Sequence, residues 1–221
     1  MSQQTNPEHP HLHGPEWGVD RPEHLVIFVH GWGADGHDLI TLAPEFSAAG
    51  LAGTRFLAPH APFPCSANPA GREWFPLHHL TKEEIAAGSA RVWPVLSNYL
   101  DQQSHRYNLA LSRIALIGFS QGTMVALALT VQRPLAAILG FSGLLPVLDS
   151  QKPVARSPVM LIHGDDDPIV PVRGSIKACQ TLQDEGYQVR LIRRPGLGHG
   201  IDMEGIRCGA DFLRDAMAAS C

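Results

Sequence analysis

Short apolar segments alternate with helical segments along almost the whole chain, and this order constrains the fold more than any other feature. The segments are expected to be strands, and the first of them is a continuous run with β-branched and aromatic members, as in a strand buried on both faces. They lie at residues 25–29, 54–58, 114–117, 136–139, 159–162 and 187–192. Helices are expected at 38–49, 81–103 (kinked or divided by Pro94), 121–132, 174–185 and 208–219. This alternation predicts an α/β protein with a mostly parallel sheet and helices on both faces.

The chain reads as one domain preceded by an arm. Residues 1–23 are polar and rich in proline and histidine, and we expect them to form an arm or a short surface strand. Residues 24–221 contain no repeat and no linker, so they are expected to form a single domain. Residues 59–80 form a long proline-containing loop whose aromatic side chains argue against disorder, and long loops inside compact domains are usually functional.

Composition excludes several classes of protein. Seventeen Lys and Arg against 21 Asp and Glu give a net charge of −4, which argues against a dedicated nucleic-acid binder. The N-terminal segment has no apolar signal region, and no apolar run approaches the ~20 residues of a membrane span, so stable membrane insertion is not expected. The four cysteines include no CxxC pair, which favours reduced thiols in a cytoplasmic protein.

The motif with the strongest chemical implication is Gly118-Phe119-Ser120-Gln121-Gly122, between a buried strand and an apolar helix. A sharp strand-to-helix turn of this kind lifts a serine Oγ out of the sheet, and the flanking glycines relieve crowding. The start of the helix then offers an N–H group and a partial positive charge to a developing oxyanion. The pattern indicates a nucleophilic serine at Ser120.

A serine nucleophile needs a base and a carboxylate that orients the base. His199, between Gly198 and Gly200 after the strand at 187–192, is the candidate base. The candidate acids follow the strand at 159–162, and spacing alone does not separate the three: Asp165, Asp166 and Asp167.

Other histidines have simpler interpretations. His163 ends a buried strand and His30 begins the loop after the first strand, so both are expected to be structural. The arm carries alternating histidines without a fourth ligand at a suitable spacing, so no metal site is expected there: His9, His11 and His13.

Four ordered motifs, HGWGADGHDL, GFSQGTM, HGDDDPIVP and GLGHGID, resemble the phospholipase/carboxylesterase family of α/β-hydrolases over roughly residues 24–215. That family includes acyl-protein thioesterases and small bacterial carboxylesterases. The resemblance implies an α/β-hydrolase fold, with Ser120 as nucleophile, Asp167 as orienting acid and His199 as base. It also implies an oxyanion hole formed by the backbone N–H groups of Trp32 and Gln121.

Two positions depart from the family pattern. In this family the strand-to-helix turn around the serine, called the elbow, usually ends in two glycines, and here Thr123 takes the place of the second. In eukaryotic thioesterases an aspartate often follows Trp-Phe in the long loop, and here Pro76 takes its place. The second departure favours simple ester hydrolysis over protein depalmitoylation.

The substrate pocket is expected to be an open, apolar-walled groove. Residues 141–158 are too few for a large cap domain, which leaves the loop at 59–80 as the cover. An alternative is that the aromatic side chains of this loop only hold it down. The predicted pocket residues are Trp32, Phe63, Trp74, Phe75, Leu77, Leu145 and Ile169.

Together these features predict a serine carboxylesterase that hydrolyses short- to medium-chain esters through an acyl-enzyme and needs no metal or organic cofactor. The expected partner is a small ester or thioester, and homodimer formation is left open. One alternative is a lysophospholipase or acyl-protein thioesterase acting on long chains. Another is a ligand-binding protein that keeps the fold without turnover. Dienelactone hydrolases share the architecture but typically use cysteine, and Ser120 argues against that class.

Overall fold

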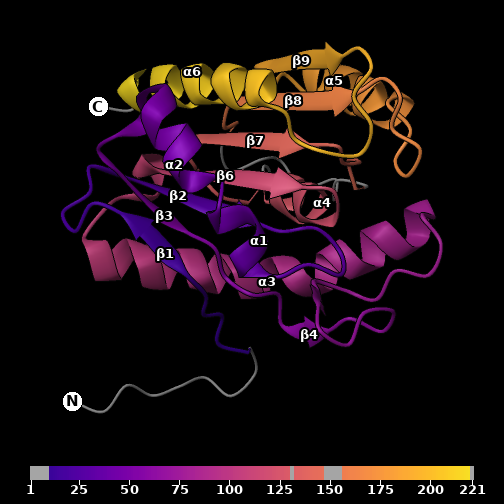
Figure 1. The fold of residues 1–221 in the computed structure, drawn as a ribbon, viewed down its shortest axis with the longest axis horizontal. Coiled ribbons are helices and arrows are strands. Elements are labelled where there is room, and N and C mark those ends of the chain that lie inside the picture. Colours follow the sequence, from indigo (N-terminus) through magenta and orange to yellow (C-terminus); the bar gives the residue numbers. More distant parts are fainter. Residues whose placement is uncertain (1–9, 130–131, 147–155, 220–221) are drawn as a thin grey trace.

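The computed structural model describes residues 10–129, 132–146 and 156–219. In these residues a seven-stranded sheet runs through the middle of the molecule, with strand order β1-β3-β2-β6-β7-β8-β9 (Figure 1). Neighbouring strands are parallel except β1, which is antiparallel to β3. The strands are β1 (Glu16–Gly18), β2 (His24–Val29), β3 (Thr54–Leu57), β6 (Ile114–Phe119), β7 (Ala137–Phe141), β8 (Val159–Gly164) and β9 (Val189–Arg194). A two-stranded sheet pairs β4 (Phe63–Pro64) with β5 (Arg72–Glu73).

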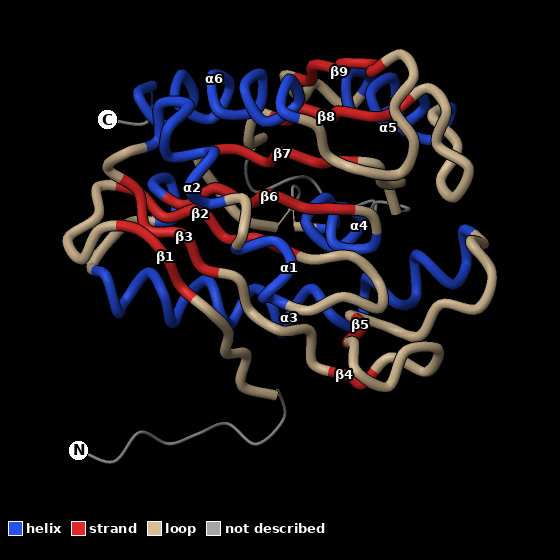
Figure 2. Tube along the Cα trace, viewed as in Figure 1, coloured by secondary structure: helices blue, strands red, loops and turns tan. Residues whose placement is uncertain are grey.

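Helices cover both faces of the sheet (Figure 2). Alternate side chains of one strand point to opposite faces. Leu25 and Ile27 of β2 therefore join a core with α3, α4 and α5, whereas Val26 and Phe28 join a second core with α1, α2 and α6. The helices are α1 (Gly36–Ile40), α2 (Ala43–Phe46), α3 (Lys82–Tyr107), α4 (Gln121–Ala128), α5 (Arg173–Asp184) and α6 (Met203–Ala219). The predicted parallel sheet with helices on both faces is confirmed.

The structure refines the helix predictions at three places. The single helix expected at 38–49 is α1, α2 and a π-helical turn (Ser47–Leu51), because Pro44 begins a new helix and Gly50 takes a φ of 120°. Of the two outcomes expected at Pro94, a kink or a division, division does not occur: α3 is continuous, and the buried Val92 and Val95 pack into the core on both sides of the proline. Helix α6 starts five residues earlier than expected, where Asp202 Oδ1 accepts the N–H of Gly205 at 2.8 Å. Residues 130–131 of the predicted helix at 121–132 lie outside the described residues.

The N-terminal arm contributes β1, as the alternative of a short surface strand foresaw. Glu16 in this strand accepts hydrogen bonds from Arg55, Arg106 and Tyr107. Burial would raise the pKa of Glu16, but these donors outweigh it and the pKa is lowered. Side-chain contacts therefore tie the arm to β3 and to the end of α3.

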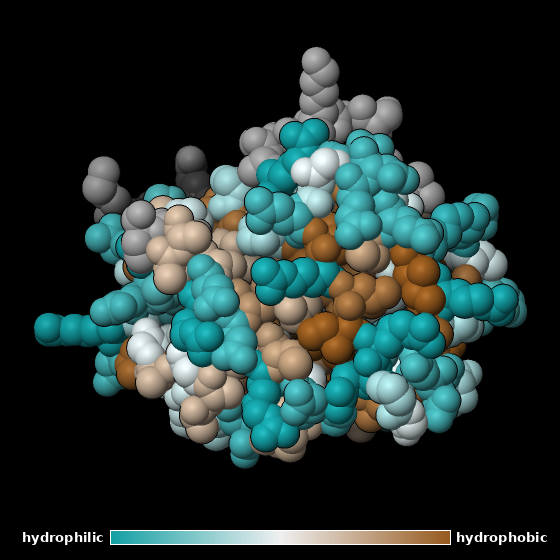
Figure 3. Space-filling model, turned by 90° about the horizontal axis from the view of Figure 1, so that it is seen from above, coloured by the Kyte–Doolittle hydropathy of each residue, from teal (hydrophilic) through white to brown (hydrophobic). Residues whose placement is uncertain are grey.

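The other edge of the sheet is β9, which lies with α6 on the face seen in Figure 3. That face mixes apolar with hydrophilic side chains, and Arg190 and Arg193 of β9 are exposed. Charged side chains on an edge strand disfavour pairing with another chain. In the parts of the chain that the structure describes, no helix has the length and apolar character needed to cross a membrane.

Candidate active site

Ser120 lies in the tight turn between β6 and α4. Its φ of 53° and ψ of −115° are unusual for a non-glycine residue, and such backbone strain is concentrated at functional sites. The turn is held by a hydrogen bond from the Ser120 N–H to the Phe141 carbonyl at 2.9 Å. The side chain is partly exposed at the carboxyl edge of the sheet. This is the geometry that the Gly118–Gly122 motif predicts.

Thr123 explains how the elbow does without its usual second glycine. Its side chain is buried, and its Oγ1 donates to the Phe141 carbonyl at 2.8 Å. Space for it comes from two facing glycines, because a Cβ on Gly140 or Gly143 would lie within 2.6 Å of Thr123 side-chain atoms. Gly140 of β7 and Gly143 after it thus provide the room for the threonine side chain that replaces the usual glycine.

Of the three consecutive aspartates, Asp167 is the one that meets His199. Its Oδ2 lies 2.7 Å from Nδ1 of His199, while Oδ1 accepts the N–H groups of Ile169 and Val170, both at 2.9 Å. Asp165 instead pairs with Arg193. A carboxylate on Nδ1 leaves Nε2 of His199 available to accept a proton.

A second histidine, His163, contacts the same carboxylate. It is buried, and its Nε2 lies 2.8 Å from the Val170 carbonyl and 3.1 Å from Asp167 Oδ2. Both neighbours are acceptors, so Nε2 carries a hydrogen. Its Nδ1 meets Ser175 Oγ at 2.7 Å. The structural role expected for His163 is confirmed, but its contact with Asp167 was not foreseen, because no sequence pattern links the two side chains.

His199 also packs against the serine turn. Its ring centroid lies 4.9 Å from that of Phe119, the residue before Ser120. Asp167 thus contacts His199, and His199 contacts the residue before Ser120. The three residues follow strands β8, β9 and β6, respectively. These three strands present their carboxyl ends at the same edge of the sheet (Figure 1).

Asp167→Asn should lower kcat by roughly 10³–10⁴-fold, because an amide in place of the carboxylate no longer orients His199 as a base. Burial would raise the pKa of Asp167, but the hydrogen bonds from His199, Val170 and Ile169 lower it below its usual 3.8. The stability that this carboxylate contributes is present above the usual pKa and is lost as the pH falls through the lowered one. In denaturant unfolding, the free energy of unfolding of the wild type should therefore exceed that of Asp167→Asn at pH 7. The difference should become smaller in acid. An Asp167→Asn variant with wild-type kcat would contradict the role of Asp167 as the acid that orients His199.

The two proposed oxyanion donors come from the start of α4 and from the loop after β2. Gln121 opens α4, where the first N–H groups have no acceptor within the helix. Gly31 brings the loop after β2 close to the serine, since a Cβ on it would lie 3.5 Å from Ser120 Cβ. Among the described residues, neither Trp32 nor Gln121 donates its backbone N–H to a backbone acceptor. Both groups are therefore candidates for binding an oxyanion.

The side chain of Gln121 has a separate task that the sequence did not reveal. It is fully buried, accepts the Trp74 N–H at 3.0 Å and donates to the Phe75 carbonyl at 2.7 Å. The Trp74 indole N–H donates to the His30 carbonyl at 2.9 Å. These bonds fasten the long loop to the elbow and to the end of β2.

His30 is the structural histidine that the sequence indicated. Its Nδ1 donates to the Gly31 carbonyl at 2.8 Å, and its Nε2 accepts the Ala61 N–H at 2.9 Å. Burial lowers the pKa of His30 to about 4, so the ring is neutral near pH 7. This neutral ring fixes the loop that carries Trp32.

The predicted pocket residues occupy different environments. Trp74 and Phe75 have no exposed surface and pack in the core, which is the loop-anchoring alternative raised above. Trp32 is 37% exposed, and its indole N–H donates to Glu73, a buried carboxylate that sequence reasoning missed. Phe63 lies under the Arg91 guanidinium, and Leu77 packs on the core. Ile169 is 57% exposed, whereas Leu145 lines a cavity.

That cavity has a volume of about 500 Å³ and lies between the start of α3, residues 144–146 and α5. Its apolar lining includes Leu80, Ile85 and Leu144 beside Leu145. The segment that supplies the two leucines passes the serine, because a Cβ on Gly143 would lie 3.1 Å from the Ser120 carbonyl oxygen. The volume is within the usual range of ligand pockets, roughly 300–1,000 Å³.

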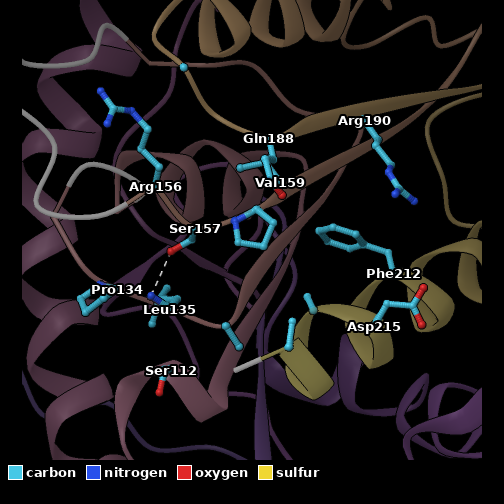
Figure 4. Close-up of a pocket in the computed structure, with 15 residues that line it drawn as sticks. Ser112, Pro134, Leu135, Arg156, Ser157, Val159, Gln188, Arg190, Phe212 and Asp215 are labelled. Carbon is cyan, nitrogen blue, oxygen red and sulfur yellow. Dashed lines mark hydrogen bonds between the residues drawn. The ribbon is translucent and has the colours of Figure 1, made fainter. Parts of the chain in front are cut away.

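A second cavity, of about 590 Å³, lies at the opposite edge of the sheet (Figure 4). Arg156, Val159 and Gln188 line it near the beginnings of β8 and β9, and Phe212 lines it from α6. Ser120 and His199 follow the carboxyl ends of their strands, so this cavity is not part of the site around the serine.

Comparisons with known proteins agree with this geometry. The family model described as phospholipase/carboxylesterase matches residues 16–217. Acyl-protein thioesterase 1 of Gibberella zeae is 32% identical over 209 residues, which cover 86% of this chain and 88% of that protein. Esterase YpfH of Escherichia coli K12 is 28% identical over 211 residues, which cover 92% and 88%. The crystal structure of esterase PE8 matches with a TM-score of 0.87 and 38% identity, covering 94% of this chain and 100% of that one.

The parallel sheet, the strained serine turn and the acid–histidine pair on the following strands define an α/β-hydrolase, the fold class that the sequence predicted. The chain belongs to the phospholipase/carboxylesterase family and is an ester-hydrolysing enzyme.

Proposed function

We propose that this enzyme is a serine carboxylesterase that hydrolyses short- to medium-chain carboxylic esters through an acyl-enzyme on Ser120. The observation that carries the proposal is the run of contacts from Asp167 through His199 to Phe119 at the serine turn. These contacts support His199 as the base that takes the proton of the Ser120 hydroxyl.

In the proposed reaction, Nε2 of His199 takes the proton of Ser120 as Oγ attacks the carbonyl carbon of the ester. The N–H groups of Trp32 and Gln121 bind the resulting oxyanion, and Asp167 stabilises the imidazolium. The tetrahedral intermediate then collapses, and the alcohol leaves with the proton from His199. A water molecule releases the acid by the same steps in reverse, which restores the serine and the neutral histidine.

The apolar cavity beside Leu145 suits the acyl chain of such a substrate. Lining by leucine and isoleucine side chains favours hydrocarbon, and the nearby Lys82, Lys177 and Glu185 leave a polar rim. A walled cavity of limited volume favours acyl chains of limited length. We therefore assign Leu145 to the acyl pocket, with Trp32 and Ile169 as exposed walls on the side of the leaving group.

A series of p-nitrophenyl esters from acetate to palmitate tests the proposal. We expect kcat/KM to peak at short or medium chains, and Leu145→Trp to lower it more for the longer esters than for acetate, because the added ring fills the cavity. Ile169→Trp, on an exposed wall, is the matched control and should leave the chain-length profile unchanged. A peak at palmitate would contradict the proposed substrate class.

A second candidate, acyl-protein thioesterase activity, is favoured by the name of the Gibberella zeae relative. The two functions differ in chain length and leaving group. Palmitoyl thioesters turned over faster than butyrate esters, with Ser120 required in both cases, would select the thioesterase.

A further inference from the structure

Away from Ser120, histidines and an aspartate gather where the loop between β2 and α1 meets the segment after β3. One side-chain ligand atom from each of Asp35, His37 and His60 lies within 4.8 Å of the others. Asp35 Oδ1 is 3.6 Å from His37 Nδ1, and Asp35 Oδ2 is 3.8 Å from His60 Nδ1. The His60 ring lies 5.0 Å from the His37 ring and 5.5 Å from the His13 ring, measured between centroids.

These side chains offer the atoms that a transition-metal cation binds. Asp35 uses Oδ1 to accept the His37 N–H as the N-cap of α1, which leaves Oδ2. His60 uses Nδ1 to accept the Gly36 N–H at 3.1 Å, which leaves Nε2. Metal–ligand bonds of about 2.0–2.1 Å put the ligand atoms of a tetrahedral zinc site about 3.4 Å apart. A side-chain rotation of the exposed His37 and a shift of the partly exposed His60 ring would bring the free ligand atoms to this spacing.

The local charges favour a cation. The carboxylate of Asp38, in the first turn of α1, adds a second negative charge beside Asp35. The nearby cation, Arg72, donates to the carbonyls of Ala61 and Pro62.

We propose that Asp35, His37 and His60 bind a divalent cation of the zinc class, with His13 of the N-terminal arm as the fourth ligand. The donor set of neutral imidazoles and one carboxylate is one that Zn²⁺ accepts in proteins. His13 already lies at this place, because its carbonyl accepts the His60 N–H at 2.8 Å. The bound ion would join the arm, the loop that carries Trp32 and the segment after β3. It takes no part in the chemistry at Ser120.

The test is calorimetric titration of the chelator-treated, untagged protein with Zn²⁺, together with thermal unfolding. We expect one equivalent to bind, and Tm to rise by roughly 5–11 °C at a concentration about 100-fold above Kd. Asp35→Asn keeps a side chain that caps α1 but removes the charge, and His37→Gln removes an exposed ligand. Each should weaken Zn²⁺ binding at least tenfold without changing ester hydrolysis in the absence of metal.

The matched control is His78→Gln, an exposed histidine outside the cluster, which should bind Zn²⁺ like the wild type. Replacement of Zn²⁺ by Co²⁺ should produce the intense visible absorption of a tetrahedral site, and His13→Gln should reduce it. The proposal is overturned if the wild type binds no Zn²⁺. It is also overturned if Asp35→Asn and His37→Gln bind as tightly as the wild type, since the ion would then be held elsewhere.

Discussion

Ser120→Ala should lower kcat for p-nitrophenyl ester hydrolysis by ~10⁴-fold or more while the protein stays folded. The substitution removes the only atom that forms the acyl bond in the proposed reaction. It leaves Asp167, His199 and their 2.7 Å contact in place. The hydrolysis that remains would come from substrate binding and the oxyanion donors alone.

Ser142→Ala is the matched control, since it makes the same chemical change at the end of the neighbouring strand β7. Its Oγ is buried and has no hydrogen-bond partner among the described residues, so its removal should leave kcat nearly unchanged. Steady-state kinetics on both variants, with mass spectrometry of the wild type to trap the acyl-enzyme, checks the prediction. Turnover by Ser120→Ala within tenfold of the wild type would place the nucleophile elsewhere. Loss of turnover in both variants would indicate general damage to this edge of the sheet.

Gly122→Ala should be the most damaging small substitution in the elbow. A Cβ at this position would lie 1.8 Å from the Val29 carbonyl oxygen and 2.7 Å from that of His30. Both atoms are backbone, so no rotamer change relieves the clash, and α4 or the end of β2 must move. We expect a loss of stability of about 3 kcal/mol or more, which corresponds to a fall in Tm of roughly 6–12 °C.

The same movement would displace the loop that carries the Trp32 N–H, so kcat of the folded fraction should fall as well. Gly53→Ala is the control, because a Cβ there meets no atom within 4 Å. Thermal unfolding followed by circular dichroism, with kinetics measured well below Tm, separates the two effects. A Gly122→Ala variant with wild-type Tm would show that the elbow packs less tightly against β2 than the structure indicates.

The order of strands and helices could be predicted because it depends on local patterns. Continuous apolar runs predicted the central strands, and Thr81, whose side chain accepts the Glu84 N–H, predicted the start of α3. Features that depend on packing could not be decided from such patterns. The sequence left open whether Pro94 kinks or divides α3, and the structure has one continuous helix with buried side chains on both sides of the proline.

The sequence by itself determined the elbow, because the glycines around Ser120, the preceding strand and the following helix are neighbours in the chain. It also placed His199 and a group of aspartates on later strand ends, since parallel strands share one carboxyl edge. Only the tertiary structure decided that Asp167 faces His199 and that Gln121 holds the long loop. It alone brought His60 to Asp35. Each of these contacts joins residues on separate segments, so side-chain packing and strand register decide them, and a linear pattern does not encode either.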